Sequence, residues 1–458
     1  MEVNGKVIQG DCLEVLREMP SNSVDSVVAD PPYGLSKEPN ITEVLTKWIA
    51  GEPYDHGHGG FMGKSWDSFV PHPDVWKEVY RVLKPGGHAL VFAGTRTQDL
   101  MTIALRLGGF EIRDVIEWLY FSGFPKSMDV GKAFDRRRKE DSEAIRSVAV
   151  YLREKLEASG KTRTAIDDHF GTSNVSQYWF SPHRNTQVPP WDKYMFLKEF
   201  LFLSDKMDAE VWRLNGRKGK PGDAWENAEI VGEYAGTPGG FGDHRFSFND
   251  KLIRSRTTDL ARKWDGWGTA LKPAHEPIIV ARKPLAGTVA ETVEKFGTGV
   301  INIDGCRIGR VEGDRTEYGV SGDEPSDVTA GIYGKFAERL AYTTHDSGRF
   351  PANCVTTGDD AFYSPYFNVA PQSVSKKASK RDRGVGNTHP TVKPTDLMAW
   401  LVRLVTPPGG TVLDPFAGSG STLVSAKREG FGFIGVEREP EYVEIIRSRV
   451  EASEEEAA

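Results

Sequence analysis

Two short segments near opposite ends of the chain combine residue types that suit chemistry on a nucleotide or an amine. Residues 30–33 read Asp-Pro-Pro-Tyr, and residues 414–422 read Asp-Pro-Phe-Ala-Gly-Ser-Gly-Ser-Thr. The first segment joins a carboxylate to two rigid prolines and an aromatic ring. The second joins a carboxylate to a glycine-rich turn, where a backbone can approach a ligand closely. Together they predict one site that holds a nucleotide beside an amino group.

The segment at residues 30–33 suits an exocyclic amino group. Because prolines lack an N–H, the Asp30 carboxylate and the Pro31 carbonyl can both accept hydrogen bonds from one NH2 group. Held in this way, the nitrogen lone pair turns toward an incoming methyl group. Tyr33 offers a flat face on which an extruded base can stack. The alternative interpretation is an ordinary Pro31-Pro32 turn with Asp30 as a cap.

The glycine-rich segment predicts a nucleotide-binding loop between a strand and a helix. A short strand, Thr411–Leu413, enters Asp414, and Gly418 and Gly420 permit a tight turn. Ser421 or Thr422 is expected to cap the following helix.

A second strand, Phe431–Val436, ends at Glu437, 23 positions after Asp414. An acidic side chain at that position suits ribose hydroxyls. A dinucleotide-binding enzyme is the alternative, but the third glycine of G-x-G-x-x-G is replaced by Leu423. A nucleotide without a pyrophosphate fits better, which favours S-adenosylmethionine (SAM).

The N-terminal region predicts strand, helix and strand before Asp30. The expected elements are Val7–Gln9, Leu13–Met19 and Val24–Ala29. Taken together, the segments resemble the amino (N6-adenine and N4-cytosine) DNA methyltransferases of the permuted β type, in which the catalytic tetrapeptide precedes the SAM loop. The resemblance covers roughly residues 1–125, 264–283 and 386–450.

This resemblance implies an α/β fold, a doubly wound Rossmann-like sheet of the SAM-dependent methyltransferase kind assembled from both ends of the chain. It implies that Asp30, Pro31, Pro32 and Tyr33 act on a base flipped out of double-stranded DNA. Residues expected to contact SAM are Asp11, Cys12, Asp30, Thr391, Lys393, Asp414, Pro415, Phe416, Ala417, Gly418, Ser419, Gly420, Ser421, Thr422 and Glu437. Asp11 is expected at the SAM adenine amino group, and Lys393 and the Thr391 backbone at the methionine end.

Further segments match the same family. Residues 75–92 look like a helix, a Pro85-Gly86-Gly87 turn and a strand. Residues 389–394, His-Pro-Thr-Val-Lys-Pro, resemble the element before the SAM loop, and a helix is expected over Leu397–Val405. Residues 272–283 resemble a strand that pairs with Ile112–Tyr120. His275 in that segment is expected to be structural, because the amino proton can leave after methyl transfer.

The core segments are separated by two long stretches. The expected division is 1–125 catalytic half, 126–263 inserted mainly helical module, 264–283 core strand, 284–385 target-recognition region, 386–450 SAM-binding half and 451–458 acidic tail. In the module, a helix is expected over 142–158. Helices near Thr162 and from Ser173, around a Gly171 turn, weakly resemble a helix-turn-helix. A packing module is the alternative, and Asn174, Gln177 and Arg184 are the side chains best placed to read DNA.

Other stretches carry looser expectations. Residues 34–70 are expected to form a closing loop in which Lys64 and Trp66 touch DNA. Residues 297–309 are expected to form two short strands around Asp304-Gly305. The basic cluster of residues 376–383 is either a solvated loop or a phosphate contact. Aromatic residues 120–124 wall the base pocket or belong to the core.

Charge and composition limit the kinds of partner and compartment that the sequence predicts. The chain has 458 residues and a net charge of −7, but residues 126–283 hold 28 Lys and Arg against 23 Asp and Glu, and the remainder holds 30 against 42. A relatively basic insertion is compatible with DNA. Cys12, Cys306 and Cys354 share no metal-ligand spacing, so neither a metal nor a disulfide is expected. No apolar run or signal pattern points to a membrane, so a cytoplasmic protein of a bacterial or phage-infected host is expected.

The sequence therefore predicts a site-specific DNA methyltransferase acting on adenine N6, within or outside a restriction–modification system, and by analogy a homodimer. Adenine is favoured by Asp30, because Ser is commoner at that position in the N4-cytosine branch. The alternatives are N4-cytosine methylation, an RNA amino-methyltransferase, and a DNA-binding regulator with an inactive core.

Overall fold

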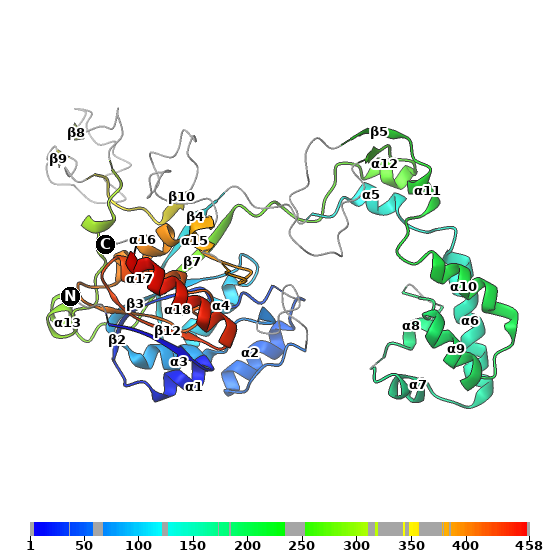
Figure 1. The fold of residues 1–458 in the computed structure, drawn as a ribbon, viewed down its shortest axis with the longest axis horizontal. Helices are drawn as coiled ribbons and strands as arrows, with labels where there is room; N and C mark the ends of the chain where they lie inside the picture. The colour runs from blue at the N-terminus through cyan, green and yellow to red at the C-terminus, as the bar shows by residue number, and fades with distance from the viewer. Residues whose placement is uncertain are drawn as a thin grey trace, which may run out of the picture. The chain divides into compact units, whose positions relative to one another are not determined.

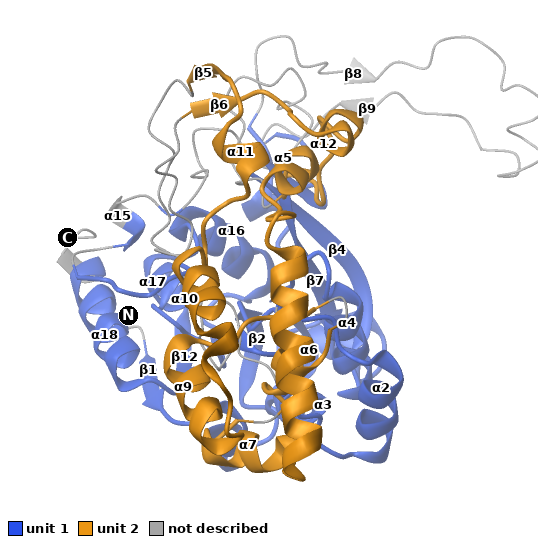
Figure 2. Ribbon diagram, turned by 90° about the vertical axis from the view of Figure 1, so that its right-hand side faces the viewer, with its two compact units in different colours: residues 1–124, 273–458 blue, residues 125–272 orange. Residues whose placement is uncertain are grey.

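The computed structural model describes residues 4–35, 37–57, 67–120, 127–172, 174–182, 185–233, 252–309, 317–318, 342–343, 348–356, 378, 380–383 and 386–455. The chain divides into two compact units (Figure 2). Unit 1 comprises residues 1–124 and 273–458, and unit 2 comprises residues 125–272. Lys64, Trp66, Arg184 and the expected wall segment 121–126 lie outside the described residues, as does most of 310–379.

The helices and strands have the following bounds. Unit 1 contains β1 Gly5–Gln9, α1 Cys12–Glu18, β2 Val24–Ala29, α2 Ile41–Ala50, α3 Pro73–Val82, β3 Leu83–Phe92, α4 Gln98–Leu107, β4 Glu111–Leu119, β7 His275–Arg282, α13 Val289–Phe296, η4 Asp304–Cys306, β8 Glu317–Tyr318, β9 Tyr342–Thr343, β10 Cys354–Thr356, α15 Lys380–Arg383, α16 Thr395–Val405, β11 Thr411–Asp414, α17 Ser421–Arg428, β12 Gly432–Glu437 and α18 Pro440–Glu455. Unit 2 contains α5 Val130–Asp135, α6 Ser142–Ser159, α7 Arg163–His169, α8 Gln177–Phe180, α9 Trp191–Phe200, η3 Asp205–Met207, α10 Asp208–Gly216, α11 Asp223–Glu226, β5 Ile230–Glu233, β6 Leu252–Arg254 and α12 Asp259–Lys263. Within these described residues no helix is long and apolar enough to span a membrane.

Unit 1 is built on one eight-stranded sheet with the order β1-β12-β11-β2-β3-β7-β4-β10 (Figure 1). Adjacent strands are parallel except around β7, which runs antiparallel to both β3 and β4. The expected pairing of the 272–283 segment with the 112–120 strand is therefore confirmed. The α/β doubly wound sheet built from both ends of the chain is also confirmed, since β1 and β2 pair with β12 and β11.

Alternate residues of the central strands pack on opposite faces of the sheet. Val28, Leu90 and Val412 belong to the core beneath α16, α17 and α18. Their neighbours Val27, Ala89 and Leu413 belong to the core on the face that includes α1, α3 and α4. Because both faces are covered, all six residues of β2 are buried, and the buried strand predicted over Val24–Ala29 is confirmed.

The sheet has its switch point between β11 and β2. From β11 the chain passes through α17 to β12, whereas from β2 it proceeds in the other direction to β3. In open parallel sheets, ligands bind outside the carboxyl ends of the strands at such a point. Asp414 closes β11 and Asp30 follows β2, so the two chemical segments flank this point.

Several local expectations for unit 1 need correction. The Pro85-Gly86-Gly87 segment lies inside β3, where it shifts the register with β2 instead of separating a helix from a strand. Within residues 34–70, Ile41–Ala50 forms helix α2, because its buried Val44 and Trp48 recur at a spacing of four residues. The expected strands around Asp304-Gly305 are wrong, since this segment is the 3₁₀ helix η4.

Unit 2 has its own hydrophobic core, which includes Val148, Leu152 and Leu156 of α6. Helix α6 confirms the helix expected over 142–158. Helix α7 begins after its cap Thr162, but the next helix is the four-residue α8, which starts at Gln177 instead of Ser173.

The Asp167 carboxylate explains the late start of α8. Its oxygens accept hydrogen bonds from the Ser176 backbone N–H at 2.9 Å, the Ser176 hydroxyl at 2.7 Å and the Thr172 hydroxyl at 3.2 Å. These bonds tie Thr172 and Ser176 to Asp167, just before the first residue of α8. Because Trp179 and Phe180 are buried in the unit 2 core, α8 is not the long exposed second helix of a helix-turn-helix.

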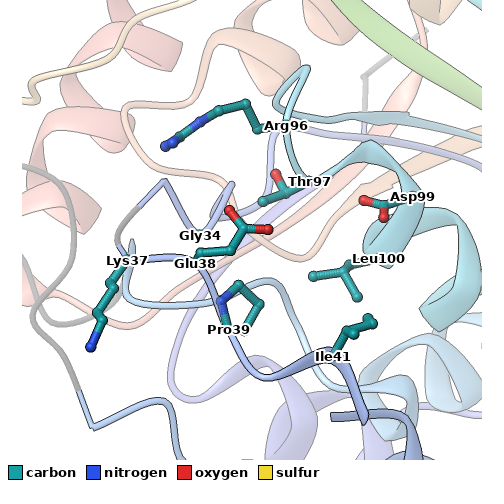
Figure 3. Close-up of a pocket in the computed structure, with 9 residues that line it drawn as sticks. All are labelled: Gly34, Lys37, Glu38, Pro39, Ile41, Arg96, Thr97, Asp99 and Leu100. Atoms are coloured by element: carbon teal, nitrogen blue, oxygen red, sulfur yellow. The ribbon is translucent and has the colours of Figure 1, made fainter. Parts of the chain in front are cut away.

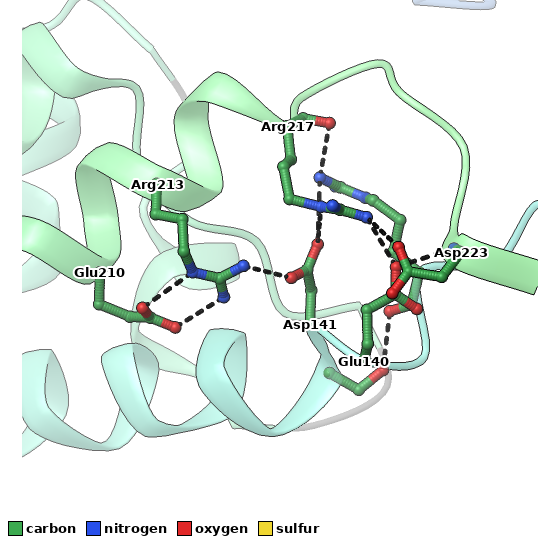
Figure 4. Close-up of polar contacts among 8 residues, drawn as sticks. Glu140, Asp141, Glu210, Arg213, Arg217 and Asp223 are labelled. Carbon is green, nitrogen blue, oxygen red and sulfur yellow. Dashed lines mark hydrogen bonds and ion pairs between the residues drawn. The ribbon is translucent and has the colours of Figure 1, made fainter. Parts of the chain in front are cut away.

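A buried carboxylate joins the two ends of unit 2's helical core (Figure 4). Asp141, which is fully buried, lies 2.9 Å from Arg213 Nη1 and 3.0 Å from Arg217 Nε. Arg213 also contacts Glu210, and Arg217 also contacts Glu140 and Asp223. The start of α6 is thereby fixed to the end of α10.

Replacing Asp141 with Asn should destabilise unit 2 by about 2 kcal/mol, because two charge-assisted hydrogen bonds lose the charge of a buried acceptor. Hydrogen exchange of α6 and α10 peptides measures this loss within unit 2 alone. Glu210→Gln, at a partly exposed partner of the same arginine, is the matched control and should change exchange far less. Equal protection in the wild type and the Asp141→Asn variant would contradict the assigned role.

Candidate functional site

The two chemical segments meet at the carboxyl ends of β2 and β11. The paired residues Leu413 and Val27 set the register that places Asp414 and Asp30 at one edge. Asp414 is buried, and burial raises its pKa from 3.8 to about 7, with the charges of Asp30 and Glu437 acting in the same direction. Hydrogen bonds from the Thr422 hydroxyl and the Phe416 N–H oppose this rise. The edge therefore concentrates negative charge.

Three polar side chains gather around Asp30. Tyr33 Oη lies 2.8 Å from Asp30 Oδ1 and 2.9 Å from Glu276 Oε2. Lys393 Nζ donates to Asp30 Oδ2 at 2.7 Å and to Tyr33 Oη at 3.1 Å, and it lies 3.3 Å from Glu276 Oε2. We call Asp30, Tyr33, Glu276 and Lys393 the Asp30 cluster.

The charges of the Asp30 cluster stabilise one another. Burial lowers the pKa of Lys393, but the carboxylates of Asp30 and Glu276 outweigh it and the net pKa is raised. Burial and the same two carboxylates raise the pKa of Tyr33 well above its ordinary value. Lys393 therefore remains an ammonium and Tyr33 a neutral phenol at neutral pH.

The members of the cluster come from three different elements. Asp30 and Tyr33 follow β2, and Lys393 precedes α16. Glu276 lies near the start of β7, which runs opposite to its neighbours, so this start lies at the same edge as their carboxyl ends. Sequence reasoning missed Glu276. The sequence did indicate that its strand pairs with residues 112–120. An antiparallel direction for that pairing would have placed Glu276 at the same edge as Asp30.

The backbone after the tetrapeptide is held from two sides. Asp67 Oδ1 accepts hydrogen bonds from the backbone N–H groups of Tyr33 at 2.9 Å and Gly34 at 3.3 Å. The Thr97 hydroxyl donates to the Tyr33 carbonyl at 2.6 Å. Neither Asp67 nor Thr97 was singled out from the sequence. These contacts fix the direction in which the Tyr33 side chain leaves the backbone.

A pocket of about 260 Å³ adjoins this segment (Figure 3). Its lining comes from the residues after the tetrapeptide and from the region where α4 begins. The lining residues are Gly34, Lys37, Glu38, Pro39, Ile41, Arg96, Thr97, Asp99 and Leu100. Two cations and two carboxylates line it, so its charge does not favour an anionic ligand.

The glycine-rich loop is tied to the end of β12. Glu437 Oε2 accepts a hydrogen bond from the Gly418 N–H at 2.8 Å, and its Oε1 accepts one from the Glu439 N–H at 2.9 Å. Burial raises the pKa of Glu437. Both oxygens keep further lone pairs, as binding to a pair of hydroxyls requires.

The helix after the loop begins differently from the sequence expectation. Gly420, with φ of 82°, is the N-cap of α17, and no side chain caps this helix. The expected Ser421 or Thr422 cap is therefore wrong, because the positive φ that the tight turn requires falls on the residue before them. The Ser421 hydroxyl is buried without a hydrogen-bond partner among the described residues.

Leu423, which breaks the dinucleotide fingerprint, has a compensating glycine on the adjacent strand. A Cβ added to Gly435 of β12 would lie 2.3 Å from Leu423 Cδ1. Close packing of helix on strand, which the third glycine of the fingerprint allows elsewhere, is here achieved by Gly435.

Other expected contacts are placed as follows. Asp11 caps α1, accepting from the Leu13 N–H at 2.9 Å, and lies beside Glu437 because the Gly10 N–H donates to the Glu437 carbonyl. Cys12 begins α1, and burial raises the pKa of its thiol to about 12. Arg449 of α18 donates to Ser419 Oγ at 3.0 Å. The His389 ring contacts the position of Gly418, and its nitrogen lies 2.6 Å from the Thr391 carbonyl.

Comparison with known protein families identifies the family to which the chain belongs. The family model described as DNA methylase, of N6 and N4 methyltransferases, matches residues 24–448. The chain belongs to this DNA methylase family. The family relationship inferred from the Asp30 and Asp414 segments is thereby confirmed, and SAM is the methyl donor that the family implies.

Individual relatives of this methylase match a smaller part. The Type II methyltransferase M2.DpnII of Streptococcus pneumoniae is 45% identical over 83 residues, 18% of this chain and 30% of that protein. M2.LlaDCHI of Lactococcus lactis subsp. cremoris is 40% identical over 78 residues, 17% of this chain and 28% of that protein. The match thus spans less than a third of the length of these curated relatives.

Solved structures give only a weak likeness. The M1.HpyAVI–SAM complex has a TM-score of 0.36 at 12% identity and covers 97% of this chain and 98% of its own. The cytosine-N4-specific PvuII DNA methyltransferase has a TM-score of 0.37 at 14% identity and covers 97% of this chain and 86% of its own. At such scores these likenesses add nothing to the family assignment.

The residues of this methylase fit the implied cofactor. The unpartnered Ser421 hydroxyl lies beside a glycine loop, and the Glu437 carboxylate is oriented by two backbone N–H groups. An orphaned buried hydroxyl and a preoriented carboxylate suit the polar groups of a nucleoside. The expected SAM-contact residues at the ends of β1, β11 and β12 lie together at one edge of the sheet. Lys393, which was expected at the methionine end of SAM, donates a hydrogen bond to Asp30.

Replacing Asp414 with Asn should change the pH dependence of stability. The folded protein keeps the Asp414 proton up to about pH 7, whereas the unfolded chain releases it near 3.8, so this group's contribution to stability falls as pH rises between these values. The upper bound is about 4 kcal/mol. The Asn variant lacks this loss and should gain stability relative to the wild type from pH 4 to pH 7.

Denaturant unfolding of the cofactor-free protein across this range provides the measurement. Asp114→Asn, at an exposed residue of β4, is the control and should follow the wild type. Parallel stability curves for the wild type and Asp414→Asn would show that Asp414 is ionised in the folded state.

Proposed function

We propose that this methylase transfers a methyl group from SAM to N6 of adenine in double-stranded DNA. One observation carries the proposal: the Asp30 carboxylate lies at the switch point of the sheet, beside the loop that ends at Ser421, and is held by Lys393 and Tyr33. An acceptor fixed in this way can orient an amino group toward the donor bound at the loop.

The Asp30 carboxylate retains the capacity to bind a substrate. An ionised carboxylate has about four lone-pair positions. Lys393 and Tyr33 occupy one on each oxygen in the cofactor-free structure. The remaining positions can accept the two hydrogens of an NH2 group together with the Pro31 carbonyl. Because the acceptor is already oriented, little reorganisation is needed when the base arrives.

SAM supplies an electrophilic methyl group when bound. We assign Glu437 to the ribose hydroxyls and Asp11 to the adenine amino group, because these carboxylates lie at adjacent strand ends. Lys393 orients Asp30 and keeps its charge, and Tyr33 is assigned to the face of the base. A base buried in a duplex cannot reach this edge, so the proposal includes base flipping.

Adenine is preferred to cytosine because Asp30 stands first in the tetrapeptide, where Ser is commoner in the N4-cytosine branch of the family. DNA is preferred because the chain belongs to the DNA methylase family and its insertion is relatively basic. Residues 284–385 are assigned to target recognition. DNA binding that depends on contacts between this region and phosphates should weaken as salt concentration rises.

Nucleoside analysis of DNA from an expression host tests the proposal. N6-methyladenine is the expected product, appearing only when the wild-type gene is expressed. N4-methylcytosine would overturn the choice of base. Neither base in host DNA, together with inactivity of the purified protein toward DNA and SAM, would refute DNA amino-methylation.

Replacing Asp30 with Ala should lower methylation by about 100-fold or more, because an oriented acceptor is lost from the reacting centre. SAM affinity, measured by calorimetry, should change little, since the loop and Glu437 remain. Asp114→Ala serves as the control at an exposed strand residue. Full activity of the Asp30→Ala variant would show that another group holds the base.

A further inference from the structure

The Asp30 cluster has more close contacts than hydrogens. Its five contacts are Lys393 with Asp30, Tyr33 and Glu276, and Tyr33 with Asp30 and Glu276. An ammonium carries three hydrogens and a phenol carries one. These four hydrogens cannot fill five contacts. When both carboxyl groups are ionised, one pair of oxygen atoms therefore faces each other with no hydrogen between them.

The unfilled contact involves Tyr33. Its single hydroxyl hydrogen can point to Asp30 Oδ1 at 2.8 Å or to Glu276 Oε2 at 2.9 Å, but not to both. A proton on one of these carboxyl groups would fill the remaining contact, because that group could then donate to Tyr33 Oη. The geometry is thus complete only after the cluster has gained one proton.

The charge of the cluster leads to the same result. One ammonium and two carboxylates give a net charge of −1, which a single proton would neutralise. Lys393 and Tyr33 already carry their protons, and the raised pKa of each keeps them there at neutral pH. The cluster can therefore change its protonation by uptake at a carboxyl group.

Glu276 is the better final position for that proton. Asp30 accepts from Lys393 at 2.7 Å through one oxygen and faces Tyr33 through the other, so its ionised form is well satisfied. Glu276 is farther from the ammonium, at 3.3 Å, and only its Oε2 takes part in these contacts. Three further titratable groups interact with the cluster. They are Tyr120, next after β4, whose pKa burial and Glu276 raise to about 12, and Asp414 and His389, which both interact with the charge of Asp30.

We propose that Glu276 is the terminal acceptor of the proton that the target amino group loses after methylation, and that the proton reaches it through Asp30 and Tyr33. This inference rests on the proposed function. A neutral amine that has gained a methyl group is positively charged and must release one proton to become the product.

The proposed step conserves protons and charge. The N–H bond of the methylated amine breaks, its electron pair stays on nitrogen, and the proton binds Asp30 Oδ1. Asp30 then passes a proton to Tyr33 Oη as the Tyr33 hydroxyl proton moves to Glu276 Oε2. At the end Glu276 is a neutral acid donating to Tyr33, Tyr33 donates to Asp30, and Asp30 is again ionised. All five contacts are then filled.

The proton position can be tested in the cofactor-free full-length protein. In protein labelled with ¹³C at Glu side-chain carboxyl carbons, the resonance missing from Glu276→Gln identifies Glu276. Its titration should shift in Tyr33→Phe, because Tyr33 Oη is its hydrogen-bond partner, and should not shift in Glu117→Gln, a matched change on the adjacent strand β4. A Glu276 titration that is the same in the wild type and Tyr33→Phe would overturn the relay.

Kinetics supply the second measurement. Glu276→Gln should lower the single-turnover methylation rate by roughly 100-fold, remove the acid limb of the wild-type pH profile and leave the SAM Kd unchanged. Glu117→Gln should keep the wild-type rate and profile. A wild-type protein that methylates no DNA would refute the proposed function. An active wild type with an equally active Glu276→Gln variant across pH would refute the relay alone.

Discussion

The pairing of β2 with β11 is the constraint on which the site depends. These strands come from opposite ends of the chain, and their short register of paired residues determines that Asp30 and Asp414 emerge at one edge. Parallel alignment sends both carboxyl ends in the same direction, and the switch in strand order leaves the space beyond them uncovered by a crossover. A shift of one residue would turn these side chains to the opposite faces of the sheet.

This convergence collects acidic groups that would repel one another in isolation. Asp30, Asp414, Glu276 and Glu437 all lie near the edge, and the structure moderates their charge in different ways. Asp414 is buried and retains its proton at higher pH, Glu437 accepts two backbone N–H bonds, and Asp30 and Glu276 share the Lys393 ammonium. A cationic methyl donor suits a site with this excess of negative charge.

The sequence predicted the structure correctly where a local pattern of residues determines both an element and its role in the site. The Val24–Ala29 segment predicted a buried strand with the correct bounds, and the Asp30 and Asp414 segments predicted one shared site. It could not predict features that depend on contacts between residues far apart in the chain. Nothing local indicates that Asp67 would bind the Tyr33 backbone, or that Gly435 would make room for Leu423. Glu276 was missed because strand direction, which places it at the edge, is a property of the whole sheet.

The point at which unit 2 enters the chain has an evolutionary consequence. β4 and β7 pair along most of their length, and beyond them the Tyr120 N–H still donates to the Ala274 carbonyl at 3.0 Å. The two ends of the intervening 153 or so residues are therefore clamped together by the sheet, and closing a longer or shorter connection there costs little additional entropy. Such a junction can accept, lose or exchange a whole module without disturbing the catalytic edge.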